Sequence, residues 1–362
     1  MDRDEAPAAT SLLYLTSLVD ESFETSSFRP YCYLLEIDNT KILLDGGVSI
    51  SSSGVVLGST LQSFKTLLKD VSLVLCSHAS VEFIGGLPLI LPMLPASAPI
   101  YMTLATQCMA RILFSDLQSS IFVKEHDEKK DENEPASLVR VSHSQLYPPH
   151  AIEHLFKRIV TLRYSQSFTI ENIIISPFAA GASLGGAYWR IRKGTDDIIY
   201  AVGISTKRER KSRDTELVEM ISLHLKANPS GDILVICPAV GKTLELILLL
   251  DAYWQLSKAP AQLIITGVEA CRLIDFAQSM LEWMGDSVLK AFSTTRENPF
   301  ALKHAKYVRE LDPKDPYDKS RRVVLLATAD EHLQCSSSYG RQLFMEQFSK
   351  NPKSFVIFTN NN

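Results

Sequence analysis

A short loop at residues 77–82, with the sequence Ser-His-Ala-Ser-Val-Glu, holds the side chains in this chain that are best suited to chemistry. His78 supplies an imidazole, Ser80 a hydroxyl and Glu82 a carboxylate. Residues 73–76 before the loop form an apolar run that is typical of a buried strand, and a Gly-Gly-Leu-Pro segment after it leads into a predicted helix. A histidine in a loop between a strand and a helix N-terminus is a common way to build a metal site, so this loop is the first candidate.

A second pattern, His150-Ala-Ile-Glu153-His154, matches the His-x-x-Glu-His zinc motif of inverted zinc peptidases. Two histidines at this spacing share one face of a helix. Two prolines directly before His150 place it in the first turn, and no third ligand is apparent nearby in the sequence. We expect a structural surface helix here, and the alternative is a divergent metal-dependent hydrolase that uses His150, Glu153 and His154.

The most basic window of the chain lies at residues 207–213. Its cations are Lys207, Arg208, Arg210, Lys211 and Arg213. A cluster of this kind can contact RNA phosphates or serve as a nuclear import signal. The remaining interpretation is a solvated linker between two domains.

The elements that must position these residues change in pattern along the chain. Before the basic window, strands are predicted at 12–18, 31–37, 41–44, 71–76, 100–103 and 196–202, and helices at 61–68 and 104–117. From Asp214 onward, helices are predicted at 214–227, 241–256, 269–283 and 339–348, and apolar strands at 232–237, 262–265, 322–327 and 354–359. This alternation predicts an α/β unit with a mostly parallel sheet.

The composition is that of an ordinary soluble protein, with 46% hydrophobic and 22% charged residues and a net charge of -4. This charge gives no global reason to expect nucleic-acid or anionic-membrane binding. The sequence contains no apolar run long enough for a transmembrane helix and no signal-peptide pattern at its start, so we expect an intracellular protein. The six cysteines have no metal-binding spacing, so we expect reduced and mostly buried thiols. An acidic loop is predicted at 124–137, where the charged sequence KEHDEKKDENE cannot contribute to a core.

These pieces, in this order, resemble the metallo-β-lactamase/β-CASP family of RNA-processing proteins. The second motif of the superfamily is Ser-His-x-His-x-Asp-His, then an apolar residue and Gly, and here it reads Ser-His-Ala-Ser-Val-Glu-Phe-Ile-Gly at 77–85. The other matching stretches lie at residues 32–35, 43–46, 185–191, 200–202 with 207–209, 241–254, 282–284 and 298–300 with His304. The resemblance extends from about Leu12 to Thr359.

The resemblance implies an α/β fold: a metallo-β-lactamase αββα sandwich with an inserted β-CASP α/β domain. It predicts a metallo-β-lactamase-like domain at residues 1–207 and a β-CASP domain at residues 208–362. Family chains return to the first domain close to the position of Asn360. The returning strands, the last metal histidine and the C-terminal partner-binding region are therefore expected to be absent from this sequence.

The resemblance also assigns the positions of the zinc ligands and of an aspartate that orients the site. The residues at these degenerate metal-site positions are Asp45, His78, Ser80, Glu82, Phe83, Ala182 and Gly203. A hydrolytic zinc needs about three protein ligands and an open position for water. Only His78 and Glu82 remain as ligand candidates, and Phe83 adds apolar bulk, so we predict no bound zinc, no other cofactor and no nuclease activity.

The function implied is that of a pseudoenzyme in pre-mRNA 3′-end processing. The expected partners are a homologous β-CASP endonuclease subunit and other subunits of the cleavage and polyadenylation machinery, in the nucleus and without a membrane. Whether the chain contacts pre-mRNA directly is left open. The alternatives are the divergent metal-dependent hydrolase or nuclease, and a β-CASP scaffold of the Integrator type.

Overall fold

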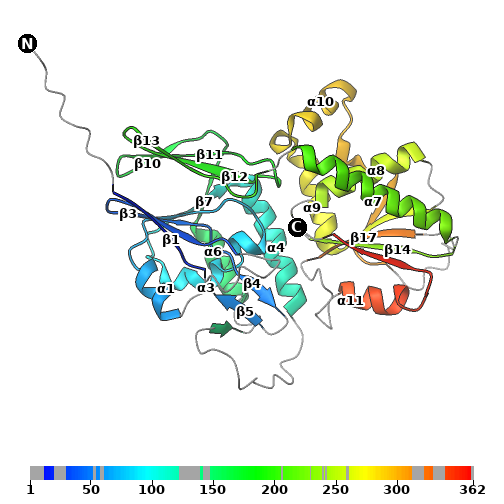
Figure 1. Ribbon diagram of the computed structural model, residues 1–362, viewed down its shortest axis with the longest axis horizontal. Coiled ribbons are helices and arrows are strands. Elements are labelled where there is room, and N and C mark those ends of the chain that lie inside the picture. Colours follow the sequence, from blue (N-terminus) through cyan, green and yellow to red (C-terminus); the bar gives the residue numbers. More distant parts are fainter. Residues whose placement is uncertain are drawn as a thin grey trace, which may run out of the picture.

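A computed structural model of the chain describes residues 12–19, 30–51, 54–57, 61–121, 139–141, 147–204, 207–228, 230–238, 240, 243–257, 261–311, 322–328 and 339–359. The acidic loop predicted at 124–137 and Cys335 lie outside these residues. The strands form four sheets: three lie in one half of the molecule and one lies in the other half, and the two halves stand side by side in Figure 1.

The first sheet has six strands in the order β1-β2-β3-β6-β7-β9. In this order they are Leu13–Ser17, Tyr33–Ile37, Thr40–Leu44, Leu73–Leu75, Ile100–Thr103 and Ile159–Leu162. Strands β1, β2 and β3 are antiparallel, whereas β3, β6, β7 and β9 run parallel to one another. The parallel arrangement brings the carboxyl ends of β3 and β6 to the same edge of the sheet, where Asp45 and His78 follow.

The second sheet is antiparallel and packs against the first sheet. Its strands are β10 (Phe168–Ile170), β11 (Ile173–Ala179), β12 (Ala187–Lys193) and β13 (Asp196–Tyr200). Alternate residues of both sheets fill the space between them, among them Leu35 and Ile37 from β2 and Trp189 and Ile191 from β12. A small third sheet consists of β4 (Ser49–Ser51), β5 (Gly54–Leu57) and β8 (Val139–Val141).

Helices cover the other face of the first sheet. They are α1 (Leu61–Leu68), α2 (Val81–Ile84), α3 (Leu87–Ile90), η2 (Leu91–Met93), α4 (Leu104–Ile121) and α6 (Pro149–Arg158). Figure 1 shows β10–β13 on one side of the first sheet and α1 and α3 on the other. This layering agrees with the metallo-β-lactamase fold expected from the sequence.

The remaining elements build one parallel α/β sheet in the order β16-β15-β17-β14-β18. The strands are β14 (Ile233–Pro238), β15 (Gln262–Thr266), β16 (Ala305–Val308), β17 (Arg322–Thr328) and β18 (Phe355–Phe358). The helices are α7 (Lys207–Ala227), α8 (Thr243–Ser257), α9 (Val268–Ser279), η3 (Leu281–Trp283), α10 (Asp286–Thr295), η4 (Pro299–Ala301), α11 (Tyr339–Leu343) and η5 (Phe344–Phe348). Apolar side chains pack on both faces of this sheet, which explains why its central strands are continuous apolar runs.

The predicted order of elements is confirmed, and three details differ. The helix predicted to reach residue 283 ends at Ser279, and a separate 3₁₀ turn follows. The sequence did not predict α10, β16 or the three strands of the small third sheet, β4, β5 and β8. The helix predicted from Asp214 begins at Lys207, so the basic window has a helical backbone.

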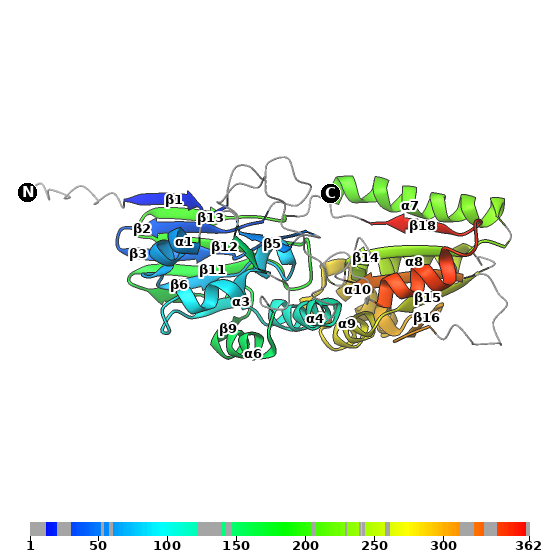
Figure 2. The ribbon, with the colours of Figure 1, turned by 90° about the horizontal axis from the view of Figure 1, so that it is seen from below.

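The division into domains at residues 207 and 208 stays a prediction. One hydrophobic cluster contains residues of the first sheet and its helices together with Val240, Leu244 and Leu273 of the α/β unit. Figure 2 shows α4 and α9 adjacent where the two units meet, and these helices are in contact. Among the described residues, no helix is both long and apolar enough to span a membrane.

Candidate functional site

The residues of the predicted metal site converge where several strands end. Asp45 follows β3, His78 follows β6, Ala182 lies in the loop between β11 and β12, and Gly203 follows β13. A backbone hydrogen bond from Ala187 to the Ser77 carbonyl, at 2.8 Å, fastens the β11–β12 loop to the end of β6. The structure therefore brings these four segments together as the sequence resemblance implies.

Asp45 is fully buried and serves as an anchor. Its Oδ1 accepts a hydrogen bond from the Ser77 backbone at 2.7 Å, and its Oδ2 accepts from the Ser77 hydroxyl at 2.6 Å and from the Tyr200 hydroxyl at 2.8 Å. Burial raises the pKa of the Asp45 carboxyl to about 7, although the three hydrogen bonds act in the opposite direction. In this arrangement Asp45 connects β3, β6 and β13.

The imidazole of His78 is buried, and both of its nitrogens have protein partners. Nδ1 lies 2.9 Å from the Ser183 hydroxyl oxygen. Nε2 lies 2.9 Å from the carbonyl oxygen of Val202. Burial lowers the pKa of His78, because the positively charged ring is disfavoured inside the protein.

These partners fix the tautomer of the neutral ring. A carbonyl oxygen only accepts, so Nε2 of His78 carries the hydrogen and donates it to Val202. Nδ1 then accepts a hydrogen bond from the hydroxyl of Ser183. Zinc binds a neutral imidazole nitrogen through its lone pair at about 2.0–2.1 Å. The only lone pair of the ring nitrogens is engaged by Ser183, so the ring is not set up to hold a metal.

Two glycines allow the ring to lie in this position. A β-carbon added at Gly203 would stand 2.7 Å from Nε2 of His78, and one added at Gly186 would stand 2.4 Å from Nδ1. Gly203 also has a φ angle of +60°, which L side chains rarely adopt. An aspartate at position 203, as the resemblance requires for a metal site, would collide with the ring.

The other predicted ligand positions are also unsuited to a metal. The ring of Phe83 lies 4.8 Å from the ring of His78 and stacks on Tyr31 with a centroid distance of 4.5 Å. Burial raises the pKa of Glu82, which disfavours its charged, metal-binding form. Within the described part of the chain, no group of three His, Cys, Asp or Glu side chains could hold a metal ion. The residues present do not fit zinc.

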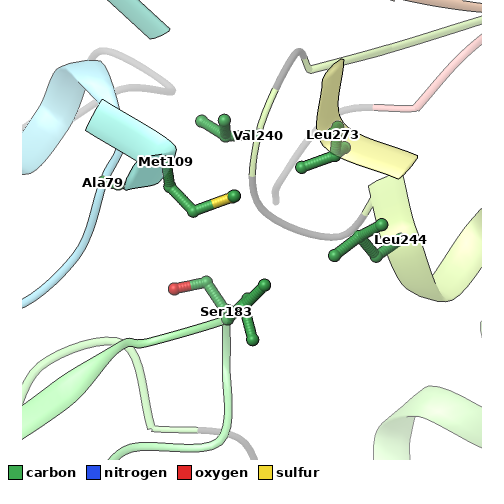
Figure 3. A pocket seen from close by; sticks show the side chains of 7 residues that line it. Ala79, Met109, Ser183, Val240, Leu244 and Leu273 are labelled. Carbon is green, nitrogen blue, oxygen red and sulfur yellow. The ribbon is translucent and has the colours of Figure 1, made fainter. Parts of the chain in front are cut away.

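The second α/β unit covers the space beside His78. A cavity of about 10 Å³, enough for about one water molecule, remains between the two units. Figure 3 shows Ala79, Met109 and Ser183 on one side and Val240, Leu244 and Leu273 on the other. The lining is mostly apolar, so it offers little to polarise a phosphodiester.

The other sequence candidates lie away from this place. His150, Glu153 and His154 are exposed on α6, where Glu153 forms a surface ion pair with Lys157 at 2.7 Å. This agrees with the surface helix expected from the sequence. The basic window occupies the first turns of α7, and its side chains are outside the described part of the structure.

Sequence reasoning missed Ser183, Val202 and Tyr200, which are the partners of His78 and Asp45. Ser183 and Val202 directly adjoin the degenerate positions Ala182 and Gly203. That adjacency is a usable signal, because a buried histidine that has lost its metal must find other hydrogen-bond partners nearby. Val202 contributes through its carbonyl, which no side-chain pattern reveals.

The cysteines agree with the expectation of reduced thiols. Cys32, Cys76, Cys108 and Cys271 are free thiols, and the thiol of Cys237 donates a hydrogen bond to the Leu326 carbonyl. Burial raises the pKa of the thiols of Cys32 and Cys76, and the nearby Asp45 carboxyl acts in the same direction. These thiols are therefore inert structural residues rather than nucleophiles.

The layered sheets and the converging strand ends define a protein class, and a sequence comparison agrees with it. The family model described as a metallo-beta-lactamase superfamily domain matches residues 34–229. The chain belongs to the metallo-β-lactamase superfamily.

Within this superfamily, the chain is similar to curated proteins whose names refer to cleavage and polyadenylation and to an endoribonuclease. The chain is 28% identical to "Cleavage and polyadenylation specificity factor subunit 2" of Arabidopsis thaliana, over 91% of this chain and 46% of that protein. It is 27% identical to the "Probable cleavage and polyadenylation specificity factor subunit 2" of Drosophila melanogaster, over 91% of this chain and 45% of that protein. A more distant match, 23% identical over 94% of this chain and 48% of that protein, is "Endoribonuclease YSH1" of Eremothecium gossypii. The chain thus spans about half the length of these relatives.

Proposed function

We propose that this chain is a non-catalytic scaffold subunit of the mRNA cleavage and polyadenylation machinery. It works in pre-mRNA 3′-end processing in the nucleus, and it pairs with a homologous endonuclease subunit and with other factor subunits. The names of the subunit 2 relatives support the process, and the endoribonuclease relative supports a shared ancestry with an active enzyme. The proposal concerns the segment that aligns with about half of those proteins.

The observation that carries the proposal is the pair of hydrogen bonds made by His78. Both ring nitrogens bind protein oxygens at 2.9 Å, where an active site would present one nitrogen to a metal. The neighbouring positions offer Phe83, Ala182 and Gly203, none of which supplies a ligand side chain. A fold that retains its layers and has lost its ligands is suited to presenting surfaces to partners rather than to hydrolysis.

The absence of zinc is tested by measuring metal content on the purified chain after dialysis. We expect far less than one zinc per chain, and no cleavage of single-stranded RNA. An active endonuclease relative, purified in the same way, is the positive control. Stoichiometric zinc that disappears in His78→Ala or His154→Ala, or RNA cleavage that disappears with it, would contradict the proposal and support the divergent hydrolase.

The assignment to a machinery is tested by affinity purification of the tagged protein from nuclear extract. We expect the endonuclease of the cleavage and polyadenylation machinery and its associated subunits among the co-purifying proteins. Recovery of the Integrator endonuclease instead would move the chain to the alternative scaffold. Recovery of neither endonuclease would contradict the pairing.

A further inference from the structure

We propose that His78 takes the structural place of a metal ion: it is a fastener, a side chain whose hydrogen bonds hold distant segments of the chain together. It thereby stabilises the surface on which the second α/β unit packs. A metal ion at such a place ties together segments that are distant in the sequence. Here the ring of His78 does so by hydrogen bonds, to Ser183 on one side and to Val202 on the other. The inference rests on the proposed absence of the metal and goes beyond it.

The first argument is the reach of the two hydrogen bonds. His78 stands at the end of β6 in the first sheet, whereas Ser183 precedes β12 and Val202 follows β13 in the second sheet. One buried side chain therefore joins the first sheet to two separate segments of the second. Its partners lie 105 and 124 residues away in the sequence.

The second argument is the fit between the ring and the glycines around it. The ring of His78 occupies the space that a side chain at Gly186 or Gly203 would need. An added β-carbon would lie 2.4 Å from Nδ1 at Gly186 and 2.7 Å from Nε2 at Gly203. The turn that carries Ser183 is itself closed by a hydrogen bond from Gly186 N to the Ser183 carbonyl at 3.0 Å. The backbone on both sides is therefore shaped for an imidazole with two hydrogen bonds and leaves no room for ligand side chains.

The third argument connects this fastener to the packing of the two units. Ser183 and Leu184 line the small cavity opposite Val240, Leu244 and Leu273 of the α/β unit. Leu184 and Val202 also pack against the cluster that contains these three residues. A loop released from His78 would therefore disturb the contact with the second unit as well.

The test uses hydrogen–deuterium exchange on the whole chain, with His78→Ala and Ser183→Ala variants. In His78→Ala we expect the amides of residues 180–187 to exchange about tenfold faster or more, because two partly buried hydrogen bonds are lost. Residues 243–249 of α8 should also exchange faster. Ser183→Ala removes one hydrogen bond and should produce a smaller increase in the same segments.

Ser115→Ala is the matched control. The Ser115 hydroxyl lies on α4 and donates to Glu269 of α9 at 3.0 Å, so this variant weakens the contact between the units without touching His78. We expect faster exchange in α9 and unchanged exchange at residues 180–187. Should His78→Ala not yield folded protein, Ser183→Ala carries the test by itself.

Zinc chloride added to the wild-type chain distinguishes a hydrogen-bonding role of His78 from a zinc-binding role. We expect no change in exchange at residues 180–187 in its presence. Slower exchange with zinc, abolished in His78→Ala, would overturn the proposal together with the metal-free function. If the His78 and Ser183 variants fold and their exchange is unchanged, and zinc has no effect, the structural role proposed for His78 is wrong. The proposed function would then remain intact.

Discussion

The hydroxyl of Tyr200 donates a hydrogen bond of 2.8 Å to the carboxyl of Asp45, which joins the last strand of the second sheet to the end of β3 in the first. Both groups are largely enclosed by the protein, and the Asp45 carboxyl also accepts two hydrogen bonds from Ser77. The residue whose position would orient a metal site in the superfamily thus has a structural partner in this chain.

Tyr200→Phe should destabilise the fold. At pH 8, where the Asp45 carboxylate is charged, the substitution leaves it with one hydrogen bond fewer, and hydrogen bonds to charged groups contribute about 1.5–3 kcal/mol. We expect a loss of about 2 kcal/mol in the free energy of unfolding, measured by urea titration. Tyr14→Phe is the matched control, because Tyr14 is 58% exposed, and it should change the stability by less than about 0.5 kcal/mol.

Asp45 should make the stability depend on pH. Its pKa is raised to about 7 in the folded chain, so the folded state holds a proton that the unfolded state releases near pH 4. The resulting contribution to stability is fully present below about pH 4 and is lost as the pH rises to about 7.

Asp45→Asn should remove this part of the pH profile, measured as the free energy of unfolding between pH 4.5 and 8. His78 acts in the opposite sense, because its lowered pKa costs stability as the pH falls below the value of a free histidine. The difference between wild type and Asp45→Asn isolates the aspartate, since His78 is present in both. Parallel profiles for the two proteins would contradict the raised pKa.

The sequence predicted the fold well because the fold depends on patterns that extend over many residues. The apolar runs at β14 and β17 follow directly from the burial of both faces of this sheet. Element ends were predicted less well, as at the start of α7, because a charged window such as 207–213 fits a helix or a loop equally well without its tertiary context.

The sequence shows which positions of the candidate site lack a ligand side chain, but it does not show which residues bind His78. Ala182 and Gly203 were identified as positions that lack a ligand, but the residues that bind His78 are Ser183 and Val202, one position away in each case. A hydrogen bond to a backbone carbonyl leaves no trace in side-chain identity. The contact of Leu244 with the first unit likewise depends on how the two units pack, so the local sequence pattern does not predict it.

Gly203→Ala should destabilise the chain more than Gly194→Ala. The two glycines have nearly the same φ angle, +60° at Gly203 and +57° at Gly194, so both variants carry the same backbone strain, of about 1–3 kcal/mol. An added β-carbon meets nothing within 4 Å at Gly194 but stands 2.7 Å from the ring of His78 at Gly203. We expect the additional loss at Gly203 to be about 1–3 kcal/mol, measured by urea unfolding. Equal losses in the two variants would mean that the ring of His78 moves away without cost.

Leu244→Ala should destabilise the chain through the contact between the two units. Leu244 is 6% exposed and lines the cavity with Ser183 and Leu273, and truncation of a buried leucine costs about 2–5 kcal/mol. Leu256 lies on the same helix and is 84% exposed, so Leu256→Ala is the control and should change the free energy of unfolding by less than about 0.5 kcal/mol. A loss below about 1 kcal/mol for Leu244→Ala would indicate that the units do not rely on this contact.

Charge reversal in the basic window should reveal whether it contacts RNA. If the cations at 207–213 neutralise phosphates, the double variant Lys207→Glu/Arg210→Glu should weaken binding of single-stranded RNA and lower the salt dependence of the binding constant by about one per lost contact. The control is Lys65→Glu/Lys69→Glu, which makes the same change in net charge at two exposed lysines in and directly after α1. Binding is measured by fluorescence anisotropy at several salt concentrations. Equal effects of the two double variants would point to net charge alone, and unchanged binding in both would favour a helical linker without RNA contact.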